Sequence, residues 1–241
     1  MEKKISESHF INFNNGVYDL QKHKFKKMQT KNTALMNVDY DYTDKFTEHK
    51  KDLIKYLEDL VPIESDRNLL LNCISRGLIE KNNRETCLNI YGDSNSGKTT
   101  FISLLAETMG DYLIKIDSNI LTKSIKKSLK ELLFLKKKRY VTSELNTNDK
   151  INTGLYKSLA SGEKMYIGRE NTLVQIYEPV HTMCIVSNVQ MDFNEDIGAT
   201  RRTKYIKFPK KFETNVEIGK KIKLWKQDFM LLLIENLKIN K

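Results

Sequence analysis

Residues 88–101 read LNIYGDSNSGKTTF, and this stretch is the most informative part of the chain about its fold. A short apolar run ends at Gly92 and leads into GDSNSGKT, which fits the phosphate-binding pattern G-x-x-x-x-G-K-S/T. Apolar residues then recur at helical spacing as far as Met109, and Gly110 stands where a helix would end. A strand, a glycine-rich loop and a helix follow one another in the order that the motif requires, so we predict a phosphate-binding loop here.

The chemistry of this loop follows from its residue types. The N–H groups of a glycine-rich loop and of a helix N-terminus point at an anion. Lys98 is expected to reach the β- and γ-phosphates of ATP, and the hydroxyl group of Thr99 to bind Mg²⁺. The residues predicted to hold the nucleotide are Gly92, Asp93, Ser94, Asn95, Ser96, Gly97, Lys98, Thr99 and Thr100.

The composition indicates a globular protein with a polyanionic partner. Hydrophobic residues make up 39% of the 241 residues, which is enough for a packed core, and the formal net charge of +10 favours nucleic acid. Cys73, Cys87 and Cys184 are far apart, which predicts reduced thiols in an intracellular, cytoplasmic protein. We find no apolar signal sequence and no apolar run long enough to span a membrane, so we expect no membrane partner.

Three segments precede the phosphate-binding loop. Residues 9–20 alternate between apolar and polar around Asn14-Asn15-Gly16, which predicts a β-hairpin. Residues 21–45 are polar and are expected to be irregular. Residues 46–81 carry two helical patterns separated by Pro62, so we predict a small helical region in front of the core.

Strands and helices alternate after the loop, which predicts a parallel α/β sheet with the site at its carboxyl edge. The expected elements are a strand at 112–116, a basic amphipathic helix at 119–135, a strand at 139–143, a helix at 151–160, a hairpin at 164–177, a buried strand at 180–187, a loop that includes 198–202, a strand at 204–208 and a helix at 217–238. We divide the chain into an N-terminal accessory region at 1–84, an ATPase core at 85–216 and a C-terminal helix packed on the core at 217–241.

Polar residues at the strand ends are candidates for catalysis. An ATPase needs a carboxylate for Mg²⁺ and the attacking water, a polar group that contacts the γ-phosphate, and positive charge for the transition state. Glu144 follows the strand at 139–143, and Asn188 ends the strand at 180–187. Arg201 and Arg202 precede the last strand, and we expect one of them to act as an arginine finger on the ATP of a neighbouring subunit.

The order of these features resembles the superfamily 3 helicases, specifically the poxvirus-type primase-helicase branch of large DNA viruses, phages and mobile elements. The segments that carry the resemblance are INFNNGVYDL at 11–20, GDSNSGKTT at 92–100, RYVTSE at 139–144, KSLASGEKMYIGREN at 157–171, HTMCIVSN at 181–188 and RRTKYIKF at 201–208. Together they cover nearly the whole chain, and their order and spacing are more specific than any one of them.

The resemblance implies a P-loop NTPase core of the AAA+-like type that assembles into a ring, usually a hexamer. ATP would lie between subunits and receive an arginine from the neighbour. The hairpin at about 162–176 would line the central channel, where Lys164 and Arg169 are candidates for contacts with the phosphates of single-stranded DNA.

Three residues depart from the family pattern. Ser143 precedes Glu144 where many ring ATPases carry a second acid, which leaves one carboxylate to serve both the metal and the water. Glu163 stands where aspartate is more usual, and Met191 stands where proline is common.

The resemblance therefore implies an ATP-dependent replicative DNA helicase, with a primase or polymerase as a further partner and, if viral, a place in the host cytoplasm. We expect the chain to be the helicase module alone, either as a separate protein or as part of a longer one. The alternatives are an ATP-hydrolysing initiator that binds or melts an origin, a P-loop kinase of small molecules, and a scaffold that binds ATP without turnover.

Overall fold

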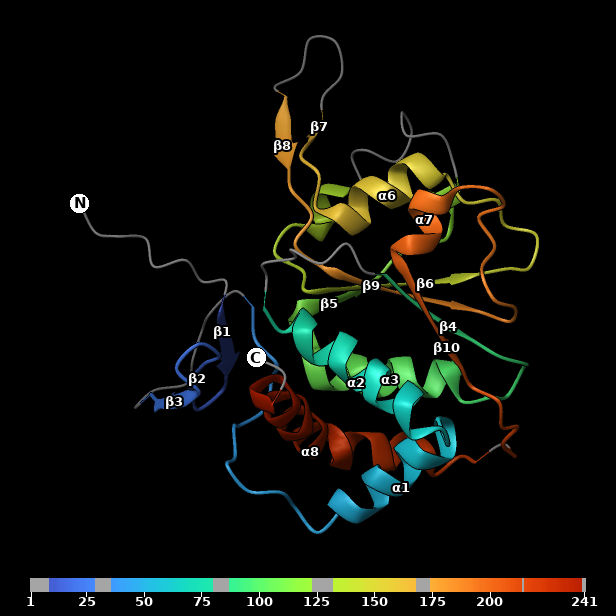
Figure 1. Ribbon diagram of the computed structural model, residues 1–241. Coiled ribbons are helices and arrows are strands. Elements are labelled where there is room, and N and C mark those ends of the chain that lie inside the picture. Colours follow the sequence, from blue (N-terminus) through green and yellow to red (C-terminus); the bar gives the residue numbers. More distant parts are fainter. Residues whose placement is uncertain are drawn as a thin grey trace.

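The computed structural model describes residues 9–28, 36–79, 87–122, 132–167, 174–213 and 215–239. Within these residues the centre is a sheet of five parallel strands in the order β10-β4-β9-β6-β5 (Figure 1). The strands are β4 (Cys87–Tyr91), β5 (Leu113–Lys115), β6 (Tyr140–Leu145), β9 (Thr182–Ser187) and β10 (Thr203–Lys207). The predicted α/β class with a central parallel sheet is confirmed.

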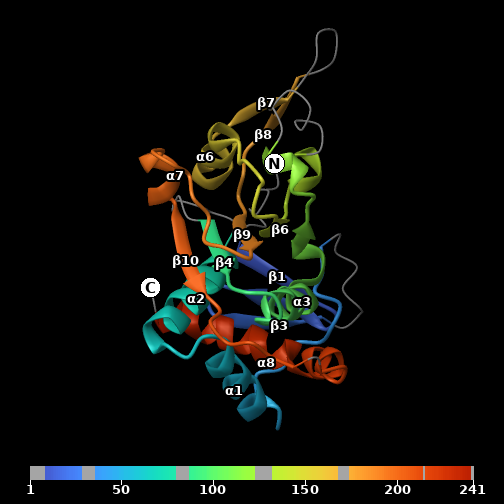
Figure 2. The same ribbon diagram turned by 90° about the vertical axis from the view of Figure 1, so that its right-hand side faces the viewer.

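Helices cover both faces of the sheet (Figure 1, Figure 2). One face carries α1 (Lys50–Leu60), α2 (Glu64–Gly77), α3 (Lys98–Met109) and α8 (Ile218–Ile239), and the other carries α4 (Asn119–Thr122), α6 (Thr153–Ser161) and α7 (Ile197–Arg201). Successive strand residues point to opposite faces, so Cys87 and Leu88 belong to different buried clusters. None of the described helices is both long and apolar enough to cross a membrane.

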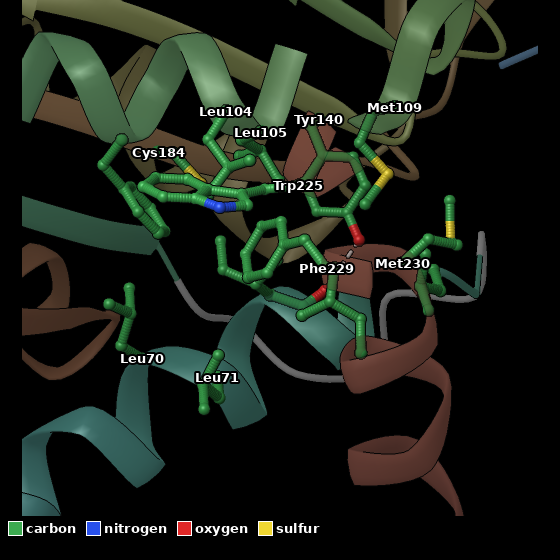
Figure 3. Close-up of a cluster of buried hydrophobic side chains, with 14 of the residues drawn as sticks. Leu70, Leu71, Leu104, Leu105, Met109, Tyr140, Cys184, Trp225, Phe229 and Met230 are labelled. Carbon is green, nitrogen blue, oxygen red and sulfur yellow. Dashed lines mark hydrogen bonds between the residues drawn. The ribbon is translucent and has the colours of Figure 1, made fainter. Parts of the chain in front are cut away.

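Helix α8 closes the larger of the two buried clusters (Figure 3). The ring of Phe229 meets that of Phe101 on α3 edge to face at 6.1 Å, and the indole of Trp225 lies 4.9 Å from the ring of Tyr56 on α1. The hydroxyl of Tyr140 on β6 donates to a main-chain carbonyl of α2 at 2.6 Å. Helices α1, α2, α3 and α8 therefore share one core with the sheet, and this core supports the start of α3.

The N-terminal part forms a separate antiparallel sheet of β1 (Phe10–Phe13), β2 (Gly16–Asp19) and β3 (Lys24–Lys27). The predicted hairpin is confirmed, but the expectation of an irregular segment is wrong for residues 24–27. The carboxylate of Asp19 accepts the N–H groups of residues 21 and 22, which closes the turn before β3. The ring of Phe25 then stacks on that of Tyr42 at 4.5 Å. One apolar residue in a run of lysines was too weak a pattern to predict a strand.

Three further expectations differ from the structure or reach beyond it. The strand expected at 139–143 continues to Leu145, so Glu144 lies inside it. Residues 197–201 form helix α7 instead of a loop, because the side chain of Asp196 caps the helix by accepting the N–H of Ala199 at 3.0 Å. Of the helix expected at 119–135, the structure describes α4 and a 3₁₀ turn at Leu133–Leu135, while 123–131 lie outside the described residues.

The buried carboxylate of Asp228 on α8 joins the C-terminal helix to the segment before α1. It accepts hydrogen bonds from the N–H and the hydroxyl of Thr47, both at 2.7 Å. Asp228→Ala removes both bonds, so we expect the free energy of unfolding to fall by about 1–3 kcal/mol in chemical denaturation. Glu235→Ala, on an exposed position of the same helix, is the control and should change it by less than about 0.5 kcal/mol. Equal effects of the two substitutions would contradict this role.

Candidate functional site

The phosphate-binding loop connects β4 to α3 along a tightly specified backbone. Asn95 and Gly97 have φ angles of 63° and 87°, in the left-handed region. The N–H of Phe212 donates to the carbonyl of Asn95 at 2.9 Å, which holds the tip of the loop against the segment after β10. A Cβ atom on Gly97 would lie 2.5 Å from the side chain of Leu60. Position 97 therefore requires glycine for both its conformation and its space.

The ammonium group of Lys98 lies inside the loop. The residue is 6% exposed, and Nζ donates to the carbonyls of Gly92 at 2.5 Å and Asp93 at 2.7 Å and to the hydroxyl of Ser96 at 3.3 Å. Burial lowers the pKa of Lys98, while the carboxylates of Glu144 and Asp93 act in the opposite direction. The loop thus concentrates positive charge at the N-terminus of α3, where phosphate oxygens are bound in this motif.

The register of the sheet brings three predicted site elements to one edge. Tyr91 on β4 is paired with Ser187 on β9, and Ser187 is paired with Leu145 on β6. All three strands are parallel, so the loop that starts after Tyr91 and the turn that contains Asn188 leave the sheet side by side. Glu144 is one residue before the paired end of β6, at the same edge.

Glu144 and Thr99 line the same small hollow, together with Lys115, Thr142 and Ser143. The carboxylate of Glu144 is half-exposed and lies 3.6 Å from the ammonium group of Lys115. The hydroxyls of Thr142 and Ser143 are buried and have no hydrogen-bond partner among the described residues. The carboxylate of Glu144 and the hydroxyl oxygens of Thr99 and Thr142 are hard ligands of the kind that Mg²⁺ prefers, so these residues fit the predicted metal.

Arg201 and Arg202 lie at the opposite edge of the sheet from the phosphate-binding loop. They directly precede β10, whose first residue, Thr203, pairs with Cys87 at the start of β4. Strand β10 is about 13 Å long at the usual rise per residue, so the same chain does not bring these arginines to Lys98. Arg201 is exposed, whereas the guanidinium of Arg202 donates to Ser161 Oγ at 2.8 Å and to a main-chain carbonyl of α7 at 3.0 Å.

The predicted hairpin is confirmed as β7 (Met165–Ile167) paired with β8 (Gln175–Tyr177), and it projects from the α6 face (Figure 1). Lys164 precedes β7, with its ammonium group 3.7 Å from the carboxylate of Glu178. Arg169 lies outside the described residues. Tyr166 and Ile176 are register partners, and both side chains are more than half exposed. The sequence did not single out this exposed apolar pair, because alternation in so short a hairpin does not reveal which side is covered.

A second hollow of about 350 Å³ opens beside the loop, on the side of α1 and the segment after β10. Its walls combine aromatic and apolar side chains with polar groups, which is typical of small-molecule sites. The hydroxyl of Tyr56 is buried and has no hydrogen-bond partner among the described residues. The lining residues are Tyr56, Leu60, Asn95, Gly97, Thr100, Phe212, Glu213, Asn215 and Ile218. Most of them come from parts of the chain distant from the motif, so sequence spacing does not reveal this hollow.

Asn89 is a further polar residue that sequence analysis passed over as part of the apolar run before the loop. It is fully buried in β4, and its side-chain amide is hydrogen-bonded to residues of β9 and to Met191. A polar residue inside the apolar strand of a phosphate-binding motif is the signal that was available in the sequence.

Comparison with known proteins identifies one curated relative and several solved structures with the same fold. No family model matches the chain. Over 95% of its length it is 26% identical to a protein of Acanthamoeba polyphaga mimivirus named "Putative helicase", and it spans only 27% of that protein. Two apo structures of the C terminal region of NrS-1 share the fold. The first has a TM-score of 0.62 and 17% sequence identity, and the match covers 93% of this chain and 56% of that one. The second has a TM-score of 0.60 and 16% sequence identity, and the match covers 85% of this chain and 50% of that one.

These comparisons and the geometry agree on the fold. The chain has an α/β fold with a five-stranded parallel sheet flanked by helices, consistent with a P-loop NTPase core. The mimivirus relative supports a helicase-like function.

The conformation of the loop leads to a prediction for Gly97→Ala. A side chain at this left-handed position costs about 1–2 kcal/mol and displaces Leu60, so both stability and anion binding should weaken. We expect a non-hydrolysable ATP analogue to bind at least about tenfold more weakly in calorimetry. Gly219→Ala on α8 is the control, because its added Cβ meets no atom within 4 Å. Unchanged affinity in Gly97→Ala would show that the loop does not hold the phosphates.

Proposed function

We propose that the chain is an ATP-dependent replicative DNA helicase that forms a ring and moves along single-stranded DNA. The observation that carries the proposal is the parallel register of β4, β9 and β6, which gathers the phosphate-binding loop, Asn188 and Glu144 at one edge. The relationship to a mimivirus protein named as a helicase and the net charge of +10 support nucleic acid as the partner.

Each of these groups has a role in the proposed hydrolysis of ATP. The N–H groups of the loop and the ammonium of Lys98 bind the phosphates, and the amide of Asn188 contacts the γ-phosphate. Glu144 accepts the proton of the attacking water. Thr99 and Glu144 hold Mg²⁺, which neutralises phosphate charge when bound.

The hollow beside the loop receives the base and ribose of the nucleotide in this proposal. It begins at Asn95, Gly97 and Thr100, so a triphosphate on the loop directs its nucleoside toward it. Phe212 offers an aromatic surface for a base, and Tyr56 a buried hydroxyl for a polar atom.

A second copy of the chain completes the site. Positive charge near the γ-phosphate stabilises the transition state of phosphoryl transfer. Arg201 lies at the far edge of the sheet on an exposed helix, beside the side chain of Ile197, which is 81% exposed. We assign Arg201 as the finger that reaches the neighbour's ATP, with Arg202 holding α7 in place through Ser161. A repeated head-to-tail contact of this kind forms a ring when its rotation closes, and a hexamer is the expected size.

The projecting hairpin is the proposed DNA-contacting element. Lys164 pairs with phosphates, and Tyr166 stacks on a base, since single-strand binding combines cations with aromatic surfaces. Arg169, which lies outside the described residues, is proposed from its sequence position alone as a second phosphate contact. A primase or polymerase is the expected partner during replication.

Substitution of Lys98, the lysine of the phosphate-binding loop, tests the proposal. Lys98→Ala should lower ATP turnover by about 100-fold or more, because the group that neutralises the transferred phosphoryl is lost. Turnover of the unmodified chain should rise with single-stranded DNA. Lys223→Ala, an exposed lysine on α8, is the control and should retain both properties.

Other results, from this assay and from two further ones, would contradict or replace the proposal. Turnover that survives Lys98→Ala would contradict it. A footprint on defined duplex DNA without unwinding indicates an initiator, and phosphorylation of a nucleoside indicates a kinase. ATP binding without turnover under all conditions indicates a scaffold.

Mixed assemblies test the contribution in trans. Arg201→Ala subunits added to unmodified chain should reduce turnover by more than their fraction, because each inactivates a neighbour's site. Arg202→Ala subunits should reduce turnover by more than their fraction only to the extent that the substitution displaces α7. Lys223→Ala subunits serve as the dilution control. A loss in direct proportion to the fraction of Arg201→Ala would show that the finger assignment is wrong.

A further inference from the structure

The side chain of Asn89 links the strand of the phosphate-binding loop to the neighbouring strand. Asn89 is fully buried, two residues before Tyr91 and therefore close to the start of the loop. Its Nδ2 group donates to Ser187 Oγ at 2.9 Å and to the carbonyl of Ile185 at 3.3 Å. Its Oδ1 atom accepts the N–H of Met191 at 3.0 Å. One amide thus uses both of its donors and its acceptor on β9 and the turn that follows.

These bonds enclose the turn that carries Asn188. Ser187 is the last residue of β9, and its hydroxyl donates to the carbonyl of Val189 at 2.6 Å. Met191 is held at the far end by Asn89. Residues 188–190 therefore lie between two points that are both fixed to β4. Asn188 itself is exposed, so its position depends on the turn and not on packing of its own side chain.

The pairing of the strands does not require this amide. Strands β4 and β9 are already joined along five register positions, from Cys87 with Met183 to Tyr91 with Ser187. A buried amide costs free energy unless it is fully hydrogen-bonded, and an apolar residue of similar volume would pack between the sheet and α6. The bond to Met191 also depends on a residue with an N–H group, which proline lacks.

We propose that Asn89 is a positioning residue that fixes the turn of Asn188 relative to the phosphate-binding loop. The inference rests on the proposed function for the meaning of Asn188, but the coupling itself is a property of the fold. The strand that delivers Lys98 to the phosphates also holds the amide that contacts the γ-phosphate. A displacement of about 1 Å of such a group is enough to slow a reaction strongly.

The test compares Asn89→Leu with the unmodified chain by hydrogen exchange and by kinetics. Loss of the acceptor for Met191 should speed amide exchange in the 188–191 turn by about tenfold or more, with or without nucleotide. The kcat for ATP should fall by about 10- to 100-fold, while KM changes by less than about threefold, because the phosphate-binding loop is retained. The double variant that carries Asn89→Leu and Asn188→Ala should lose no more than Asn188→Ala alone, since both substitutions act through one contact.

Two further variants show whether the effects of Asn89→Leu come from its hydrogen bonds to the turn. Ser187→Ala removes one bond to Asn89 and leaves the bond to Met191, so it should shift exchange and kcat in the same direction but less. Ser187→Ala also provides the test of the proposal if Asn89→Leu does not fold. Tyr156→Phe is the matched control, because it removes a buried hydroxyl bonded to Thr203 at the opposite edge. It should leave exchange in the turn and the ratio of kcat to KM unchanged.

The outcomes separate this inference from the proposed function. Unchanged exchange at 188–191 in Asn89→Leu overturns the coupling, whatever the activity. Multiplied losses in the double variant, or a KM that rises as much as kcat falls, overturn the positioning role. Faster exchange in a chain that never hydrolyses ATP would support the coupling and reject the proposed function.

Discussion

The parallel pairing of β4 with β9, and of β9 with β6, is the constraint on which the site depends. In an all-parallel sheet every strand delivers its following loop to the same edge. The register that sets Tyr91 beside Ser187 and Leu145 then decides which residues meet there. A shift of one residue would turn Glu144 to the other face of the sheet and away from Thr99. The buried clusters on both faces specify the register, because the same shift would exchange the side chains that meet the two helical layers and disrupt the packing of both.

The sheet also keeps the positively charged side chains predicted for the site at two opposite edges. Lys98 and the loop amides lie at the carboxyl edge, whereas Arg201 and Arg202 lie beyond the amino end of β10. Strand length alone keeps these groups apart within one chain. If one of these arginines takes part in turnover, as proposed, it must act on a triphosphate bound to another copy of the chain. Ile197 on the same helix is 81% exposed and would give such a contact an apolar component.

The phosphate-binding loop and the alternation of elements were predictable because their signals are local. Glycines, lysine and threonine at fixed spacing define the loop, and the apolar runs define β9 and α8. Strand β3 was missed because its stability comes from the contact of Phe25 with Tyr42 and not from its own lysine-rich sequence. Helix α7 was missed because it is short and depends on the cap from Asp196. The hollow at Tyr56 and Phe212 and the bonds of Asn89 join residues distant in the chain, which spacing does not reveal.

A structure of the chain with Mg²⁺ and a non-hydrolysable ATP analogue would show whether the residues gathered at the carboxyl edge form one site. We expect the triphosphate on the loop at 92–99, the metal between Thr99 and Glu144, and the amide of Asn188 facing the γ-phosphate. An arginine near that phosphate should belong to a second copy. A nucleotide bound away from the loop, or a γ-phosphate remote from both Glu144 and Asn188, would contradict this expectation.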